Sequence, residues 1–275
     1  MIQKILRFTK IEHTAFSLPL LFTGAWMGGG CRWPGFGVLL LIVLAATGAR
    51  IFGMSFNRIL DRRIDAQNPR TANRELPNGT LSIATALIIA LSGLAAYLAA
   101  CAALGPWCLS LAPLPLVPLL GYSLLKRYTV LCHFGIGLCL ALAPLGAFVA
   151  AAGHPYFSGQ VLLFSGFVFF WLSGADIIYA IQDIESDRKN GIHSLPASLG
   201  GAGAQWVAAA VHLLAIACLT SILAYGHTGL LAATDYLMTL ALFVTLYLPC
   251  IPVSTRFFPL ASLAGVAGAL APLLV

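Results

Sequence analysis

Two short segments of the chain concentrate acidic side chains at spacings that could bind a divalent cation. The chain contains nine Asp and Glu residues, and seven of them lie within residues 61–75 and 176–187. In the first segment Asn57, Asp61 and Asp65 follow one another at intervals of four residues. If this stretch is helical, all three side chains lie on one face, because residues four apart are neighbours on a helix.

The second segment repeats the arrangement. Asp183 and Asp187 are again four residues apart, and Tyr179 and Asp176 precede Asp183 by one and two turns. Each segment ends an apolar stretch of the chain. We therefore expect the two acidic segments to lie at the same end of the molecule.

Carboxylates at this spacing repel one another and destabilise a helix unless something neutralises them. Two pairs that face each other could hold two or three Mg²⁺ ions, which prefer oxygen ligands and often share them with substrate phosphates. The alternative is a solvated face whose carboxylates pair with neighbouring arginines, for which Arg62, Arg63 and Arg188 are available.

Basic residues accompany both acidic segments. Cations together with Mg²⁺ suit a polyphosphate, because both neutralise the charge that develops on a leaving diphosphate. An orientation signal at a membrane surface is the alternative reading of each single cation. The basic residues concerned are Arg58, Arg74, Lys126, Arg127 and Lys189.

The composition predicts that these segments connect membrane spans. Sixty per cent of the 275 residues are apolar and only 9% are charged, whereas soluble domains carry about 25% charged residues. So few charges cannot cover a water-facing surface, and we expect one integral membrane domain over residues 1–275. Residues 1–12 are expected to form an amphipathic surface helix.

We predict an all-α fold of about nine spans, each of about 20 apolar residues. Thirteen of the fifteen Lys and Arg residues fall on one side if the spans alternate. The positive-inside rule then places the N-terminus and both acidic segments in the cytoplasm, in a multi-pass protein of the inner (plasma) membrane. The predicted spans are residues 14–30, 37–60, 81–101, 106–125, 133–152, 160–182, 204–224, 228–249 and 257–274.

Three segments resemble the UbiA superfamily of intramembrane prenyltransferases. Residues 50–79 read RIFGMSFNRILDRRIDAQNPRTANRELPNG, residues 122–129 read YSLLKRYT and residues 176–196 read DIIYAIQDIESDRKNGIHSLP. The pattern NxxxDxxxD followed by RTxNRxLxxG is specific to this family, as is YAxQDxxxDxxxG. The similarity runs from about residue 12 to about residue 200.

The resemblance implies two four-helix groups plus one further helix around a central cavity, and it implies a role for each matching residue. Asp61, Asp65, Asp183 and Asp187 would hold Mg²⁺. The substrate would be bound by Asn57, Arg74, Lys126, Lys189, Arg50 and His133, of which Arg74 and Lys189 contact the diphosphate. Asp176, Tyr179 and Arg127 are the expected catalytic residues, and Arg50 and Arg127 are candidates for binding an aromatic carboxylate.

The implied reaction is transfer of a polyprenyl group from its diphosphate to an aromatic hydroxy acid. 4-Hydroxybenzoate and 1,4-dihydroxy-6-naphthoate, the acceptors of ubiquinone synthesis and of one menaquinone route, both remain open. Cys132 and His133 stand where the 4-hydroxybenzoate enzymes commonly carry Pro-Gln. His133 is either an acceptor contact or a structural hydrogen-bond partner. The rival function is a secondary transporter, since intramembrane carboxylates such as Asp235 also mark ion pathways.

Overall fold

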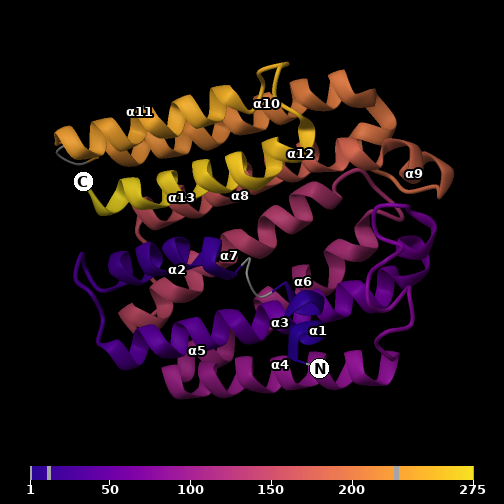
Figure 1. Cartoon of the computed structure of the whole chain (residues 1–275). Helices are drawn as coiled ribbons and strands as arrows, with labels where there is room; N and C mark the ends of the chain where they lie inside the picture. Colours follow the sequence, from indigo (N-terminus) through magenta and orange to yellow (C-terminus); the bar gives the residue numbers. More distant parts are fainter. Residues whose placement is uncertain (1, 11–13, 226–228, 275) are drawn as a thin grey trace.

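The computed structural model describes residues 2–10, 14–225 and 229–274, and this part of the chain is helical with no strand (Figure 1). The elements are α1 (Ile2–Thr9), α2 (Thr14–Gly28), α3 (Phe36–Gln67), α4 (Ile83–Leu104), α5 (Pro106–Leu111), α6 (Pro113–Leu125), α7 (Cys132–Ala152), α8 (Gly159–Ala180), η2 (Ile181–Asp183), α9 (Ile184–Lys189), α10 (Leu195–Ala224), α11 (Leu230–Thr245), α12 (Val253–Thr255), η3 (Arg256–Ala261), α13 (Ser262–Leu270) and η4 (Ala271–Leu273).

Local sequence signals explain where several helices begin. The hydroxyls of Ser82, Ser158 and Ser194 each accept a hydrogen bond from the backbone three residues later and so cap α4, α8 and α10. Pro106 and Pro113 open α5 and α6, at positions where the missing amide hydrogen would have no helical partner.

Seven helical stretches within the described residues are long and apolar enough to cross a membrane. Two shorter apolar helices, Phe16–Gly28 and Leu230–Thr245, lie where the first and eighth spans were predicted. The predicted multi-pass helical membrane class is confirmed, whereas the count of nine spans stays a prediction. Residue 228, the predicted start of the eighth span, lies outside the described residues.

Helix α3 is longer than a bilayer requires. Its 32 residues extend about 48 Å at ~1.5 Å per residue, compared with a hydrocarbon core of about 30 Å. Part of α3 must therefore leave the core, and its polar residues are concentrated at the carboxyl end, from Asn57 onward. The first acidic motif thus lies where α3 can reach the membrane surface.

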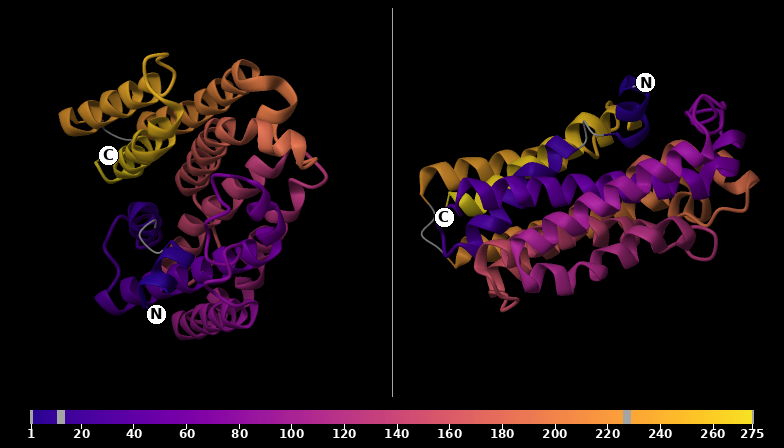
Figure 2. Two further views of the ribbon diagram at one scale, coloured as in Figure 1. Left: turned by 45° about the vertical axis from the view of Figure 1, so that its right-hand side comes forward. Right: turned by 90° about the horizontal axis from the view of Figure 1, so that it is seen from below.

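The long helices run alongside one another (Figure 2). Helix α3 packs along α4, α7 lies between α2 and α8, and α10 covers the other side of α8. Close approach of α2 and α7 depends on Gly24 and Gly28, since a Cβ at Gly24 would lie 2.7 Å from the Cα of Pro144. Small residues at this spacing allow membrane helices to pack backbone against backbone.

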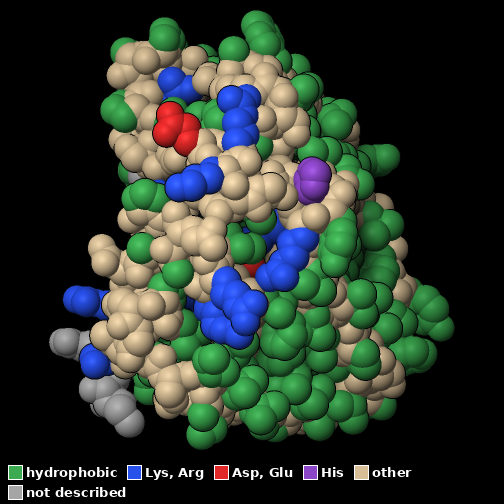
Figure 3. All heavy atoms as spheres, turned by 90° about the vertical axis from the view of Figure 1, so that its right-hand side faces the viewer, with side chains coloured by type: hydrophobic (Ala, Val, Ile, Leu, Met, Phe, Trp, Pro, Cys, Tyr) green, Lys and Arg blue, Asp and Glu red, His purple; other side chains and the backbone are tan. Residues whose placement is uncertain are grey.

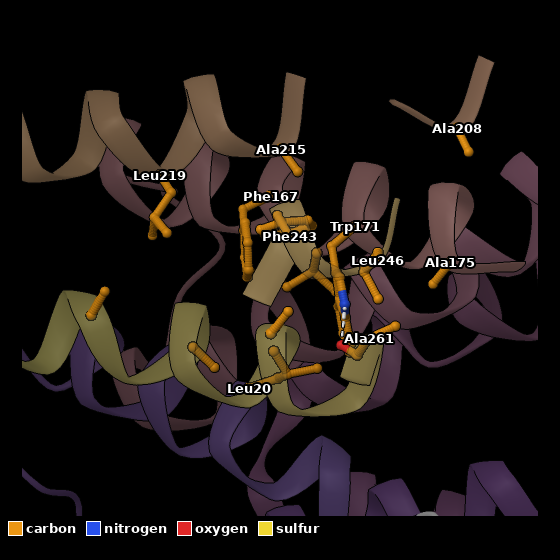
Figure 4. Packing of buried hydrophobic residues seen from close by; sticks show 14 of the residues in the cluster. Leu20, Phe167, Trp171, Ala175, Ala208, Ala215, Leu219, Phe243, Leu246 and Ala261 are labelled. Atoms are coloured by element: carbon orange, nitrogen blue, oxygen red, sulfur yellow. Dashed lines mark hydrogen bonds between the residues drawn. The ribbon is translucent and has the colours of Figure 1, made fainter. Parts of the chain in front are cut away.

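The largest buried cluster joins α8, α10, α11 and η3 (Figure 4). Phe167 and Trp171 stack within it, and the Trp171 indole nitrogen donates to the carbonyl of Ala261 at 2.8 Å. This apolar cluster fixes α8, which carries Asp176 and Tyr179 and leads into the rest of the second acidic segment.

The predicted N-terminal helix is present as α1, whereas its place at the membrane surface stays a prediction. Phe8 is buried, and the guanidinium of Arg58 lies 6.0 Å from the centre of its ring, which ties α1 to α3. Met1 and the end of the predicted helix, Glu12 included, lie outside the described residues.

Candidate functional site

The carboxyl end of α3 presents the first motif to a central cavity. Asp61 and Asp65 are almost completely buried. The Asn57 side-chain amide donates to Asp61 Oδ2 at 2.9 Å and to the Ser123 hydroxyl at 2.8 Å. Lys126, at the end of α6, places its Nζ 2.6 Å from the same Asp61 oxygen. The predicted helix face is therefore held by two side chains from a neighbouring helix end.

The segment that follows α3 folds back over the motif. Thr71 donates its hydroxyl to the Asp65 carbonyl at 3.0 Å. One terminal nitrogen of Arg74 contacts both carboxylate oxygens of Asp65 at 2.9 Å. Arg74 was predicted to contact a diphosphate, and it lines the cavity. Asp65 thus already has a cationic partner that also faces the cavity.

The second motif meets the first across the cavity. Asn68 donates to Asp183 Oδ1 at 2.8 Å. Arg70 contacts both Asp183 oxygens, at 3.0 and 2.5 Å, and donates to the Tyr179 hydroxyl at 2.5 Å. These bonds link residues more than 100 positions apart in the chain. They confirm that the structure brings the two acidic segments together.

The helix changes its winding over Ile181–Asp183, between the end of α8 and the start of α9. A 3₁₀ turn over Ile181–Asp183 precedes α9, and Asp183 itself has a non-helical backbone. A 3₁₀ turn is tighter than an α turn, so Asp183 and Asp187 do not continue the regular face of α8 that carries Asp176 and Tyr179. Asp187 accepts a hydrogen bond of 2.7 Å from the Ser194 hydroxyl.

The basic residues differ in their roles. Burial is the largest single influence on the pKa of Arg70 and acts to lower it, but the hydrogen bond to Asp183 and the electrostatic attraction of Tyr179, Asp183 and Asp65 together raise that pKa. Arg62 and Arg188 donate to backbone carbonyls of Ile59 and Ala197. Among the described residues, Asp61, Asp65 and Asp183 pair with Lys126, Arg74 and Arg70, and Arg127 lies 4.0 Å from Asp61. Arg58 pairs with Glu75 at 3.8 Å. None of these pairs involves the arginines that the solvated-face alternative required.

The donor set suits a hard cation that shares its ligands with a substrate. Asp61, Asp65, Asp183 and Asp187 all line one cavity, so carboxylate oxygens predominate, as Mg²⁺ prefers. Asp61 Oδ1 is buried and has no hydrogen-bond partner among the described residues. No group of three or more His, Cys, Asp or Glu side chains in the described ranges is placed to hold a metal ion by itself. The residues fit a cation that is completed by diphosphate oxygens.

His133 and Asp176 form the other polar part of the cavity. His133 Nδ1 lies 2.7 Å from Asp176 Oδ2, and both residues line the cavity. Tyr179 packs against Phe257 with ring centres 4.4 Å apart. Arg50 also lines the cavity and contacts the carbonyl of Lys10 at 3.4 Å.

Two predicted residues lie outside the cavity lining. Lys189 is exposed on α9. Arg127 donates to the Leu60 carbonyl at 2.9 Å and lines a separate shallow groove with Arg62 and Arg63, although it is 4.0 Å from Asp61 Oδ1. Their expected contacts with the diphosphate and the acceptor stay predictions.

Sequence reasoning missed Arg70 and Asn68, which hold Asp183. Both belong to the segment NPRTANRELPNG, which is part of the family resemblance. The sequence does not show which side chains its polar residues contact. Ser123 and Ser194, which support Asn57 and Asp187, gave no signal, because an isolated serine beside a helix end is usually a cap.

The cavity combines a charged end and an apolar end. Its volume is about 680 Å³. At the charged end, lysine and arginine side chains surround a hollow at whose base an acidic side chain is visible (Figure 3). The apolar end is lined by Leu104, Cys108, Leu111, Val149 and Phe157. Such a cavity can hold a molecule with a charged head and a long hydrocarbon tail.

Comparison with known proteins gives consistent matches. The UbiA prenyltransferase family matches residues 17–256. A protein of Shewanella denitrificans named 4-hydroxybenzoate octaprenyltransferase is 29% identical over 210 residues, which cover 76% of this chain and 68% of that protein. The apo structure of a UbiA homologue from Aeropyrum pernix is 34% identical and superimposes with a TM-score of 0.82, covering 95% of this chain and 96% of that one. A UbiA homologue from Archaeoglobus fulgidus, bound to GPP and Mg²⁺, is 19% identical and has the same fold, with a TM-score of 0.71 over 98% of this chain and 99% of that one.

Proposed function

The chain belongs to the UbiA prenyltransferase family, and we propose that it uses Mg²⁺ to transfer a polyprenyl group from its diphosphate to an aromatic hydroxy acid. Membership makes it a membrane prenyltransferase. The finer assignment is supported chiefly by one observation: both acidic motifs line the same end of a cavity whose other end is apolar.

The charged end suits the diphosphate. Mg²⁺ held by Asp61, Asp65, Asp183 and Asp187 would withdraw charge from the leaving group, as it does in other phosphate chemistry. The A. fulgidus homologue with GPP and Mg²⁺ supports this assignment. Arg70, Arg74 and Lys126 each pair with one of these carboxylates and line the cavity, so they can exchange that partner for a phosphate oxygen.

The apolar end suits the isoprenoid chain. His133 and Ala150 both line the cavity and lie at opposite ends of α7. They are seventeen residues apart, or about 26 Å along a helix that rises ~1.5 Å per residue. A chain of several isoprenoid units can extend over this distance. Exclusion of water also protects an allylic cation from hydrolysis.

The acceptor belongs between the two ends. The C1–O bond breaks and diphosphate leaves with the bonding electrons, and the ring carbon of the acceptor then attacks C1 of the allylic cation. Asp176 is the proton acceptor in this proposal, Tyr179 lies beside the reacting centre, and Arg50 pairs with the acceptor carboxylate. The name of the S. denitrificans relative favours 4-hydroxybenzoate. The segments NPRTANRELPNG and GIHSLP instead resemble the UbiA-like branch of one menaquinone route, which favours 1,4-dihydroxy-6-naphthoate.

The positive-inside distribution supports a place in the inner (plasma) membrane, with the N-terminus and the acidic motifs on the cytoplasmic side. A soluble diphosphate head group and a soluble aromatic acid would then reach the charged end from the cytoplasm. A transporter function has no support from the family match.

The test uses the purified full chain in detergent with Mg²⁺ and radiolabelled polyprenyl diphosphate. Each aromatic acid is offered separately, and Asp61→Ala and Asp183→Ala serve as variants. We expect labelled lipid-soluble product from the wild type, at least 100-fold less from either variant, and no product in EDTA. The acceptor that reacts identifies the quinone pathway.

Equal turnover by wild type and Asp61→Ala would contradict the assigned role of the acidic motifs. Absence of product with both acids, under conditions in which the labelled diphosphate binds, would contradict the proposed acceptor class.

A further inference from the structure

His133 and Asp176 form a pair that the acidic motifs do not include. His133 lies near the start of α7 and Asp176 near the end of α8, and the distance from Nδ1 to Oδ2 is 2.7 Å. The His133 side chain is 3% exposed, whereas that of Asp176 is 24% exposed. Asp176 Oδ1 carries no hydrogen bond to any described residue. The histidine is therefore packed behind the carboxylate, and one carboxylate oxygen stays available to the cavity.

The other imidazole nitrogen determines how this pair is protonated. The backbone N–H of Leu195 donates to His133 Nε2 at 3.3 Å. An amide can only donate, so Nε2 must carry a lone pair and the proton of the neutral ring is on Nδ1. His133 accordingly donates to Asp176, and the carboxylate keeps its capacity to accept a proton at Oδ1.

Leu195 can supply this hydrogen bond because it is the first residue of α10. The first amides of a helix have no partner within the helix. Ser194 caps the helix and also donates to Asp187, while the Leu195 amide is used by His133. The start of α10 therefore holds both Asp187, which belongs to the diphosphate site, and His133, which belongs to the acceptor site.

The same loop is fixed to the end of α6 and to the start of α7. The His193 amide donates to the Lys126 carbonyl at 2.7 Å, and the Cys132 thiol donates to the His193 carbonyl at 3.6 Å. The residues Cys132 and His133, which replace the Pro-Gln of the 4-hydroxybenzoate enzymes, thus contact the segment GIHSLP. These two distinctive parts of the sequence form one structural unit around Asp176.

We propose that His133 is the positioning residue for Asp176, and that the start of α10 holds His133 in the tautomer this task requires. The inference rests on the proposed function and names a part of its acceptor site. His133 fixes one oxygen of Asp176 so that the other faces the acceptor hydroxyl, and it does not itself contact the acceptor.

The proton balance follows from this arrangement. The acceptor hydroxyl gives its proton to Asp176 Oδ1, and the resulting phenolate directs its ring electrons to C1 of the prenyl chain. A carbon–carbon bond forms, the C1–O bond breaks, and diphosphate leaves with the bonding electrons. The ring carbon then loses its proton to the leaving diphosphate or water, and Asp176 returns its proton to the phenolate oxygen.

A purely structural role for His133 makes a different prediction. In that case its loss would weaken the contact of α7 with α8 and α10 and lower stability, with no particular effect on the chemical step. The two roles are separated by kcat, by the KM for each substrate, and by a conservative variant.

Asn at position 133 is the conservative variant, since its amide nitrogen can occupy the place of Nδ1 and donate to Asp176. Phe fills the space without donating. We would measure kcat and both KM values for His133→Asn, His133→Phe, Asp176→Asn and the double variant His133→Phe/Asp176→Asn, together with thermal unfolding of each.

We expect His133→Phe to lower kcat about 100-fold, at the lower end of general acid–base effects, with the KM for the polyprenyl diphosphate unchanged. His133→Asn should recover at least tenfold of this loss. The double variant should be no slower than Asp176→Asn, because residues that act as one unit are not additive.

If the wild type turns over and a folded His133→Phe variant has the same kcat, the proposed role of His133 is wrong, and the proposed function is unaffected. A His133→Asn variant as slow as His133→Phe at the same unfolding temperature would also overturn the role of His133. Lack of turnover by the wild type with both aromatic acids would instead overturn the proposed acceptor class, and the inference with it.

Discussion

Substitution of Lys126 by Met is expected to destabilise the protein through Asp61. Lys126 Nζ is 2.6 Å from Asp61 Oδ2, and the two side chains are 24% and 3% exposed. At an effective dielectric constant of about 20, unit charges at this separation attract each other by roughly 6 kcal/mol. Desolvation of both groups opposes much of this attraction.

Removing the lysine leaves Asp61 buried with fewer partners. The Asn57 amide and, at 4.0 Å, Arg127 remain. Loss of one partner from a buried pair costs about 3–5 kcal/mol, and partial exposure of Lys126 favours the lower value, so we expect the free energy of unfolding to fall by about 3 kcal/mol.

The assay is reversible unfolding in detergent with EDTA present, so that no divalent cation replaces the lysine. Lys189→Met is the matched control, since Lys189 is exposed at the same end and forms no ion pair with the described residues; it should change stability by less than about 0.5 kcal/mol. Asp61→Asn/Lys126→Met should recover most of the loss, because a neutral amide needs no counterion. A Lys126→Met protein as stable as wild type, or a double variant as unstable as the single one, would refute the reasoning.

Three further predictions concern other contacts. Arg70→Met should raise the KM for polyprenyl diphosphate about tenfold, the loss of one charge-assisted clamp of ~1.4 kcal/mol; an unchanged KM in steady-state assays would exclude Arg70 from the diphosphate site. Gly174→Ala should lower the free energy of unfolding by about 1–3 kcal/mol, because the added methyl would overlap the His212 ring. That ring is fixed by hydrogen bonds to Tyr247 and the Trp171 carbonyl. Thermal unfolding at the wild-type temperature would contradict this prediction. Asp235→Leu should raise the free energy of unfolding by about 1 kcal/mol, because Asp235 Oδ2 is buried without a hydrogen-bond partner among the described residues. A lower unfolding temperature would show that the carboxylate has a stabilising role.

The sequence determined the elements that depend on local pattern. Long apolar stretches predicted the helical membrane class, because each backbone amide in lipid must be paired within its own segment. The i, i+4 spacing of Asn57, Asp61 and Asp65 predicted their common face, because α3 is a regular helix there. The spacing of Asp183 and Asp187 did not reveal the 3₁₀ turn over Ile181–Asp183, although both side chains line the same cavity as the first motif.

Only the tertiary structure decided which side chains meet. Arg70 pairs with Asp183 across 113 positions, and His133 meets both Asp176 and the start of α10. Lys189 shares the basic character of Arg70 but is turned to the surface. No periodicity distinguishes these residues, because their partners are set by how α3, α7, α8 and α10 pack. The motifs therefore determined the chemistry available to this protein, and helix packing decided which residues can take part in it.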